Sequence, residues 1–413
     1  MRPTERILRA VPVALAALLA LAAVAAAAEP LALDDSFSGD GWTTFDMGDP
    51  SGQGARDMTA AGGGAVFLVG ADAAEDAVVL RVTSDGVLAP IFGGGDGIAT
   101  LDAGGKEFAN AVVVDGDGRI VVAGATGIFG HRLMVARLEP DGDPDPTFGG
   151  GDGVFSWRRA PAGEDLAVTP SGKVVVVGSF GSPPKALVLR LTETGVFDPN
   201  FGGGDGWTTS SFGSSAEFAD VALDAKGRIV ATGWMNAGLS SDVAVGRLRL
   251  DGSFDQRFSG DGRATVDLGE RYDRGAAVAI QNDGKIVVAG GTYSDTNDDN
   301  DPLLVRFRAR GSLDMSFGVN GRRRLDLSAA HERFDDVVVE PDGDLSMAGT
   351  AAADTIVATA TPNGLSVTYR IKDYTGGIDR GTAIVRRGDG KLWVAGTITS
   401  TTQRFGLTRY FPA

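Results

Sequence analysis

A short apolar segment that begins and ends in glycine recurs seven times along the chain. The copies are residues 64–70, 118–124, 172–178, 227–233, 284–290, 343–349 and 390–396, and their closing glycines are 47 to 59 residues apart. Repetition at such a period is typical of stacked supersecondary units, each of which buries its apolar faces against its neighbours. The chain is therefore predicted to be a repeat protein.

Each copy contains four short segments rich in β-branched residues and bounded by Gly, Asp, Asn or Ser. In the fourth copy these segments are residues 220–224, 228–233, 243–248 and 263–267. Segments of this length and composition predict strands. The Asp-Gly pairs between the first two segments predict hairpins, because such turns need positive φ angles. Each copy is thus predicted to be a four-stranded antiparallel meander.

A second marker, a phenylalanine followed by a glycine-rich turn, joins the third and fourth predicted strands. It occupies residues 92–97, 148–153, 201–206, 258–262 and 317–321. We expect the phenylalanine to be buried between neighbouring sheets, which stabilises the fold by about 1.5–3 kcal/mol per copy. Phosphate-binding glycine loops lead into helices, whereas these turns lead into strands, so a structural role is favoured. An arginine recurs in the third strand of six copies, and we expect it to serve packing and pairing: Arg81, Arg137, Arg190, Arg247, Arg306 and Arg409.

The two ends of the chain complete one copy. Residues 37–41 repeat the turn marker and precede a segment equivalent to the fourth strand of a copy, but no strands equivalent to the first three come before it. The last copy has the first three strands and lacks the fourth. We therefore predict an all-β, seven-bladed β-propeller of four-stranded antiparallel blades, closed by the N-terminal strand, which hides the sheet edges. The predicted blade cores, which we call copies 1 to 7, are about residues 54–101, 108–157, 163–212, 216–268, 273–327, 334–372, and 380–413 plus 40–46.

The first 28 residues predict a secretory signal peptide. Arg2, Arg6 and Arg9 precede an apolar stretch at residues 11–24 and small residues at 25–28. An uncleaved signal anchor is the alternative. No second stretch approaches membrane length. We expect a mature domain of residues 29–413 that is secreted, periplasmic or bound at the cell surface. We also expect this domain to be a monomer. The formal net charge of −16 argues against nucleic acid as a partner.

Several motifs resemble those of the delta-60 repeat family of bacterial β-propellers. They are Leu33-Asp-Asp-Ser-Phe37, Leu313-Asp-Met-Ser-Phe-Gly318 and Asn282-Asp-Gly-Lys-Ile-Val-Val-Ala-Gly290, and the resemblance extends over residues 31–413. The resemblance implies an exported or surface-exposed propeller. It implies no established activity, and no catalytic residue can be carried over.

The variable loops between second and third strands are the expected binding face, because the repeated turns lie on the opposite face. Two acidic groups are candidates. Asp57, Asp165, Asp220 and Asp336 each stand seven residues before the hairpin glycine, where a ring of carboxylates could bind a ligand or supply an acid and a base. Strand-end hydrogen bonding to backbone amides is the alternative. Asp295, Asn297, Asp299 and Asp301 alternate in the longest of these loops, a pattern that suits Ca²⁺, the one cofactor indicated. A solvated acidic loop is the alternative reading.

Aromatic residues flank the same loops and could stack on sugars or peptides: Phe129, Phe180, Trp234, Tyr272, Tyr293 and Tyr374. Of these we select Trp234 and Tyr293 as ligand-binding candidates. The sequence has no Cys, and its two histidines, His131 and His331, fall in different copies without metal spacing. We therefore expect a non-enzymatic binding or scaffold module whose partner is an extracellular or cell-envelope protein or glycan. The alternative is a hydrolase or lyase that acts on an extracellular polymer with carboxylates at the channel mouth.

Overall fold

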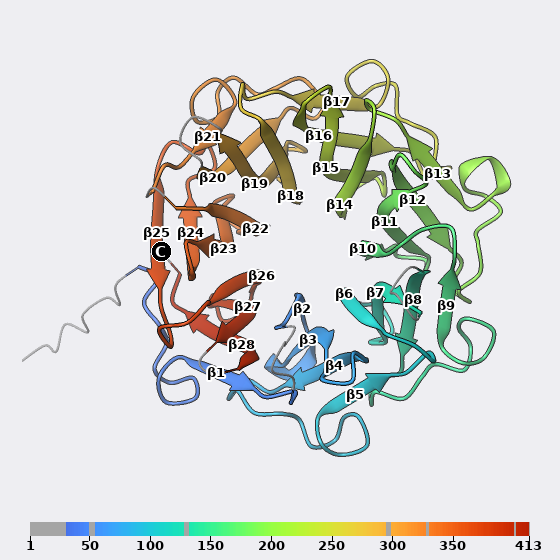
Figure 1. Ribbon diagram of the computed structural model, residues 1–413, viewed down its shortest axis with the longest axis vertical. Helices are drawn as coiled ribbons and strands as arrows, with labels where there is room; N and C mark the ends of the chain where they lie inside the picture. The colour runs from blue at the N-terminus through green and yellow to red at the C-terminus, as the bar shows by residue number, and fades with distance from the viewer. Residues whose placement is uncertain are drawn as a thin grey trace, which may run out of the picture.

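Antiparallel sheets arranged in a ring make up the fold (Figure 1). The structure is a computed structural model, and it describes residues 30–48, 54–127, 132–294, 299–327, 330–399 and 402–412. Within these ranges it has 28 strands, two 3₁₀ turns at Gly62–Gly64 and Gly202–Gly204, and no α-helix. The predicted all-β class is confirmed. The predicted signal peptide lies outside the described residues.

The strands fall into four sets by their distance from the centre of the ring (Figure 1). The innermost set is β2 (Asp57–Ala60), β6 (Phe108–Val114), β10 (Gly163–Val168), β14 (Ala216–Leu223), β18 (Tyr272–Ile280), β22 (Glu332–Val339) and β26 (Arg380–Arg386). The second set is β3 (Val66–Ala71), β7 (Ile120–Thr126), β11 (Val174–Phe180), β15 (Ile229–Ala237), β19 (Ile286–Ser294), β23 (Leu345–Ala351) and β27 (Leu392–Thr399). The third set is β4 (Ala77–Val82), β8 (Arg132–Leu138), β12 (Lys185–Leu191), β16 (Ser240–Leu248), β20 (Asp299–Phe307), β24 (Asp354–Ala360) and β28 (Gln403–Tyr410). The outermost set is β1 (Trp42–Phe45), β5 (Ile98–Leu101), β9 (Val154–Trp157), β13 (Trp207–Ser210), β17 (Arg263–Val266), β21 (Arg322–Arg324) and β25 (Val367–Lys372).

Strand pairing follows chain order within each sheet, so each copy is an antiparallel meander. The pairing of the two ends departs from chain order: β1 pairs with β28, from Trp42 opposite Thr408 to Phe45 opposite Phe405. The fourth and fifth copies differ from the prediction, because they belong to one eight-stranded sheet. A single parallel bridge between Ser241 and Tyr272 joins them, where the chain crosses from one copy to the next.

The turn phenylalanines are fully buried between neighbouring sheets, as the sequence predicts: Phe37, Phe92, Phe148, Phe201, Phe258 and Phe317. Phe148 illustrates the contact. It packs beneath Gly195 in the next copy, where a Cβ atom would lie 2.9 Å from the ring. Gly195 also has a φ of +76°, which side chains rarely adopt. The amide of Gly149 donates to the carbonyl of Thr194 at 3.1 Å, so the turn is hydrogen-bonded to its neighbour as well.

The third-strand arginines pair with a buried aspartate and cover the turn phenylalanine. Arg137 Nε lies 2.6 Å from Asp145 Oδ2, and its guanidinium carbon is 4.6 Å from the centre of the Phe148 ring. Its Nη1 donates to the carbonyl of Glu193 in the next copy at 2.5 Å. The same arrangement recurs at Arg190, Arg247, Arg306 and Arg409, which pair with Asp198, Asp255, Asp314 and Asp34. In copy 1, Ala89 stands where the aspartate would be. The predicted packing and pairing role is therefore found in five of the six copies.

We expect Phe201→Ala to lower the free energy of unfolding by about 3–5 kcal/mol, because the cavity lies between two sheets and cannot collapse freely. Urea denaturation followed by tryptophan fluorescence measures the change. Tyr369→Ala is the control, since Tyr369 is 46% exposed, and we expect it to shift stability by about 0.5 kcal/mol at most. Equal losses for the two variants would contradict the anchoring role.

Candidate functional site

The four predicted aspartates lie on innermost strands and bridge one copy to the next. Asp57 starts β2, and the other three stand where a β-bulge shifts the register: Asp165, Asp220 and Asp336. Asp57 Oδ2 accepts from the amide of Val112 at 2.7 Å. The other three aspartates accept in the same way. The amide of Val221 donates to Asp165 at 2.8 Å and the amide of Ile384 donates to Asp336 at 2.7 Å. The amide of Val278 donates to Asp220. These bonds to backbone amides match the structural alternative, and the ligand-binding role stays a prediction.

Burial raises the pKa of three of these carboxyl groups, those of Asp57, Asp165 and Asp336. It raises the pKa of Asp57 to about 7 against two opposing amide hydrogen bonds. Burial likewise raises the pKa of Asp336 to about 8, and the charges of Asp220 and Asp57 add to the effect. The pKa of Asp165 is raised well above its ordinary value by burial, by the charge of Asp220 and by a hydrogen bond between the two side chains. These three aspartates therefore keep their protons to a higher pH than a free carboxyl group does.

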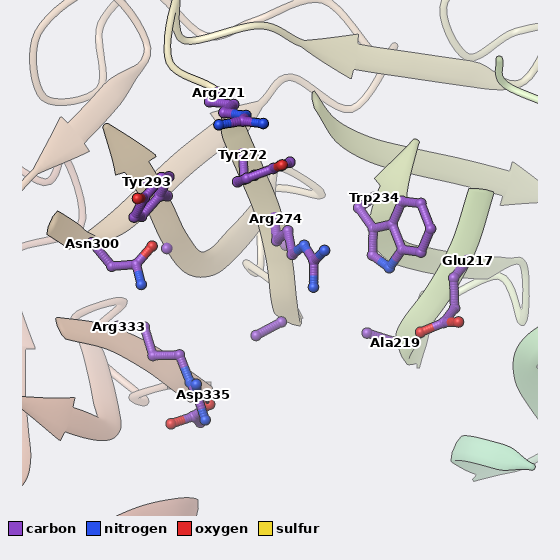
Figure 2. Close-up of a pocket in the computed structure, with 13 residues that line it drawn as sticks. Glu217, Ala219, Trp234, Arg271, Tyr272, Arg274, Tyr293, Asn300, Arg333 and Asp335 are labelled. Carbon is purple, nitrogen blue, oxygen red and sulfur yellow. Dashed lines mark hydrogen bonds and ion pairs between the residues drawn. The ribbon is translucent and has the colours of Figure 1, made fainter. Parts of the chain in front are cut away.

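A pocket of about 510 Å³ brings together the two predicted aromatic candidates, Trp234 and Tyr293 (Figure 2). Trp234 comes from β15 in copy 4 and Tyr293 from β19 in copy 5. Tyr272, at the start of β18, lies with its ring centre 5.7 Å from that of Tyr293. All three residues lie at strand ends next to the variable loops, where the sequence predicts the binding face.

Three arginines surround these rings: Arg271 and Arg274 from copy 5 and Arg333 from copy 6 (Figure 2). The guanidinium carbon of Arg274 lies 5.3 Å from the centre of the Trp234 ring, and that of Arg271 lies 5.1 Å from the Tyr272 ring. Arg333 Nε lies 2.6 Å from Asp335 Oδ1. Among the described residues, Arg274 is in no ion pair, so its charge is available to an anion.

Polar acceptors complete the lining of the pocket. Glu217 lies at the start of β14 and Asn300 in β20, facing the pocket from opposite sides (Figure 2). Burial raises the pKa of Asp335, although the charge of Arg333 opposes this shift. Aromatic faces, guanidinium groups and amide or carboxylate acceptors in one cavity suit a polar ligand of one or two rings with a negative charge.

The arginines and Glu217 were not identified from the sequence, although a signal for them exists. Ten residues before the hairpin glycine, copies 1 to 3 have Gly54, Phe108 and Ala162. Copies 4 to 7 have charged residues at that position: Glu217, Arg274, Arg333 and Arg380. Comparison of equivalent positions between copies would have placed this charge at one end of the innermost strands.

The other predicted residues do not join the pocket. Phe180 stacks on Trp157 and Trp207, and the hydroxyl of Tyr374 contacts that of Tyr410. Phe129 and His131 lie outside the described residues. So do Asp295 and Asn297 of the predicted Ca²⁺ loop. The prediction that Asp299 and Asp301 lie in the loop was wrong, because β20 begins at Asp299 and Asp301 pairs with Arg324.

Four segments match a family model described as a domain of unknown function (DUF5122) beta-propeller: residues 116–148, 169–201, 227–258 and 281–317. Each segment ends on a buried turn phenylalanine. The chain carries β-propeller repeats. No curated protein gives a significant match.

Solved structures share the fold at low sequence identity. The Chaetomium thermophilum Sqt1 bound to the N-terminus of ribosomal protein L10 is 12% identical with a TM-score of 0.50, covering 89% of this chain and 98% of that one. The polysaccharide lyase Uly1 is 11% identical with a TM-score of 0.48, covering 89% and 91%. Drosophila Semaphorin 1a, extracellular domains 1-2, is 10% identical with a TM-score of 0.48, covering 89% and 88%. At this level of sequence identity the likeness is one of fold alone. No helix within the described residues is long and apolar enough to span a membrane.

The raised pKa values predict that the protein becomes less stable as the pH rises. An aspartate whose pKa is raised on folding stabilises the folded state at low pH and loses that contribution as the pH rises through about 7 to 8. The melting temperature should therefore fall between about pH 5 and pH 8.5. Asp336→Asn should make this fall shallower.

Differential scanning fluorimetry across this pH range measures the effect. Exposed Asp85→Asn is the matched control and should leave the slope unchanged. Carboxyl groups with a lowered pKa do not change charge in this pH range, so they do not affect the slope. Burial opposes the shift of Asp34, but hydrogen bonds from Lys391 and Ser36 lower its pKa to about 2, so it is ionised throughout. A melting temperature that rises with pH would contradict the raised pKa values of these aspartates.

Proposed function

We propose that the chain is an exported seven-bladed β-propeller of the delta-60 type that acts as a non-enzymatic binding module. The 28 described strands supply seven four-stranded units, and the β1–β28 pairing supports closure by the N-terminal strand. The matches to β-propeller repeats support the family assignment. The proposed mature domain is residues 29–413, located outside the cytoplasm after removal of residues 1–28.

The proposed ligand is an acidic saccharide, such as a uronic-acid oligomer of the cell envelope or extracellular matrix. Arg274 carries this proposal, because it forms no ion pair among the described residues and lies over the face of Trp234 at the pocket wall. A carboxylate would accept hydrogen bonds from its guanidinium group, and sugar rings would stack on the aromatic faces. The cavity of about 510 Å³ accommodates one or two sugar residues.

Local charge favours this ligand over a neutral one. The whole chain carries a formal charge of −16, yet this pocket is lined by three arginines and two carboxylates, so basic residues outnumber acidic ones there. An anion is therefore attracted to the pocket and repelled by most of the remaining surface. A short acidic oligomer that enters the pocket fits this distribution better than a long polyanion that follows the surface.

The alternative, a hydrolase or lyase that uses the carboxylate ring, has weaker support. A general acid or base must reach its substrate, and the four aspartates instead accept hydrogen bonds from backbone amides of neighbouring copies. The raised pKa of Asp165 follows from burial and its partner Asp220, which a structural role explains equally well.

Arg274→Gln should weaken binding of a uronic-acid trisaccharide by about tenfold or more, because a charge-assisted pair contributes about 1.5–3 kcal/mol. Isothermal titration calorimetry measures the dissociation constant. Trp234→Ala should weaken both the acidic trisaccharide and its neutral hexose counterpart, since it removes the stacking surface.

Arg249→Gln is the matched control, because Arg249 is an exposed arginine that does not line this pocket. It should leave the dissociation constant unchanged. The binding-site proposal fails if Arg274→Gln and Arg249→Gln have the same effect. Release of unsaturated or reducing ends from an acidic polysaccharide, abolished by Asp220→Asn, would support the enzymatic alternative.

A further inference from the structure

Three carboxylates meet at the junction between copy 1 and copy 2. Asp76 precedes β4, Asp102 follows β5 and Glu107 precedes β6. One oxygen from each lies within 4.8 Å of the others. The three segments belong to two neighbouring sheets, so whatever joins these carboxylates also joins the two copies.

Glu107 is the innermost member of this cluster, and one of its oxygens lacks a partner. Its side chain is 0% exposed. Oε1 accepts a hydrogen bond from the Thr126 hydroxyl at 2.6 Å, whereas Oε2 is buried without a hydrogen-bond partner. A buried carboxylate oxygen without a donor costs several kcal/mol of desolvation. A ligand that supplies positive charge would remove that cost.

The same three positions form a carboxylate cluster at two other junctions. Between copies 4 and 5 the members are Asp242, Asp267 and Asp273, and between copies 6 and 7 they are Asp354, Asp373 and Asp379; each set lies within 4.8 Å. Asp273 and Asp379 stand at the start of the innermost strand, as Glu107 does, and both are fully buried. Among the described residues, no lysine or arginine forms an ion pair with any of the nine carboxylates. Lys106, the neighbour of Glu107, pairs with Glu75 instead.

At two other junctions the chain itself supplies the positive charge. Between copies 5 and 6 the equivalent acids are Asp301, Asp326 and Glu332, and Arg324 forms an ion pair with Asp301. The residue equivalent to Arg324 is neutral in the three clusters: Thr100, Thr265 and Ile371. At the junction of copies 7 and 1, Arg404 replaces the third-strand acid and lies 3.2 Å from Asp46.

At two further junctions none of the three positions carries an acid. At the junction of copies 2 and 3 the equivalent residues are Arg132, Arg158 and Pro161, and at the next junction they are Lys185, Ser211 and Ala216. At the junction of copies 7 and 1, where Asp46 is present, Arg404 is paired with it. An acid at these positions thus has a basic partner from the chain at the junctions of copies 5 and 6 and of copies 7 and 1, and, within the part of the chain that the structure describes, none at the junction of copies 1 and 2.

We propose that Asp76, Asp102 and Glu107 bind a Ca²⁺ ion that links copies 1 and 2. At the two repeated clusters the buried members, Asp273 and Asp379, accept hydrogen bonds at both oxygens, so the proposal is limited to the first junction. Three carboxylates supply three to six oxygen ligands, and water completes a coordination number of six to eight. With no His or Cys in the cluster, the donor set favours a hard cation over zinc or copper. Ca²⁺ suits ligands from three separate segments better than Mg²⁺, which demands a near-ideal octahedron.

Electrostatics of the clusters agree with this assignment. Burial raises the pKa of Asp76, and the charges of Asp72, Asp102 and Glu107 add to it. Burial and the charges of Asp373 and Asp379 raise the pKa of Asp354 in the same manner. A divalent cation would replace this mutual repulsion with attraction at the point where two sheets meet.

Calorimetric titration of the EDTA-treated, dialysed chain with CaCl₂ tests the proposal, together with melting in CaCl₂ and in EDTA. We expect one Ca²⁺ ion per chain and a higher melting temperature in CaCl₂. Glu107→Gln keeps the shape of the side chain but removes its charge, and it should abolish binding of this ion. Asp102→Asn, at an exposed position, should have the same effect if Glu107→Gln does not fold.

Glu332→Gln is the matched control, because it alters the equivalent buried acid at the junction where Arg324 supplies the charge. It should leave the number of bound ions unchanged. The assignment is overturned if the melting temperature is the same in CaCl₂ and EDTA, or if Glu107→Gln and Asp102→Asn bind as many ions as the unmodified chain. Equal binding of MgCl₂ would overturn the choice of Ca²⁺.

Discussion

The guanidinium group of the third-strand arginine, in the five copies where it meets an aspartate, is the contact on which the ring of sheets depends. It pairs with a buried aspartate of its own copy, covers the ring of the turn phenylalanine and donates to a carbonyl of the next copy, as Arg137 does with Asp145, Phe148 and Glu193. One side chain thus satisfies a buried charge, packs against an aromatic ring and crosses to the neighbouring sheet. A buried ion pair is stabilising only when further hydrogen bonds compensate for desolvation, and the carbonyl and turn contacts supply them.

Acidic residues stabilise the inner part of the ring in a different way. Near the centre, aspartates such as Asp57 accept amides from the adjacent copy, and their neutral form avoids repulsion between carboxylates. At three junctions between copies, a cluster of three carboxylates has one exposed member and one buried member. The buried members are Glu107, Asp273 and Asp379. The same residue type therefore serves as a protonated hydrogen-bonding group in one place and as a candidate cation ligand in another. The difference is that Asp57 accepts hydrogen bonds from backbone amides, whereas Oε2 of Glu107 is buried without a donor.

The pocket arises where the repeat loses its uniformity. Copies 4 to 6 place Trp234, Arg274 and Arg333 at strand ends that carry small or apolar residues in copies 1 to 3. The scaffold beneath them is unchanged, since the turn phenylalanines Phe201, Phe258 and Phe317 are all buried. A rigid repeated frame with local substitutions at one mouth is the arrangement by which repeat folds acquire binding sites without loss of stability.

The sequence by itself determined the strands, the turns and the order of pairing, because these depend on local patterns that recur at a fixed period. The burial of Phe148 and the pairing role of Arg137 could be predicted for the same reason. Tertiary structure decided which residues of different copies meet. Trp234 and Arg274 are 40 positions apart and contact only because β15 and β18 lie in adjacent copies. Asp299 and Asp301 resembled a cation-binding loop, yet strand pairing extended β20 over them and Arg324 reached Asp301 from a third segment. Contacts between copies follow from the radial packing of the sheets, which the pattern within one copy does not contain.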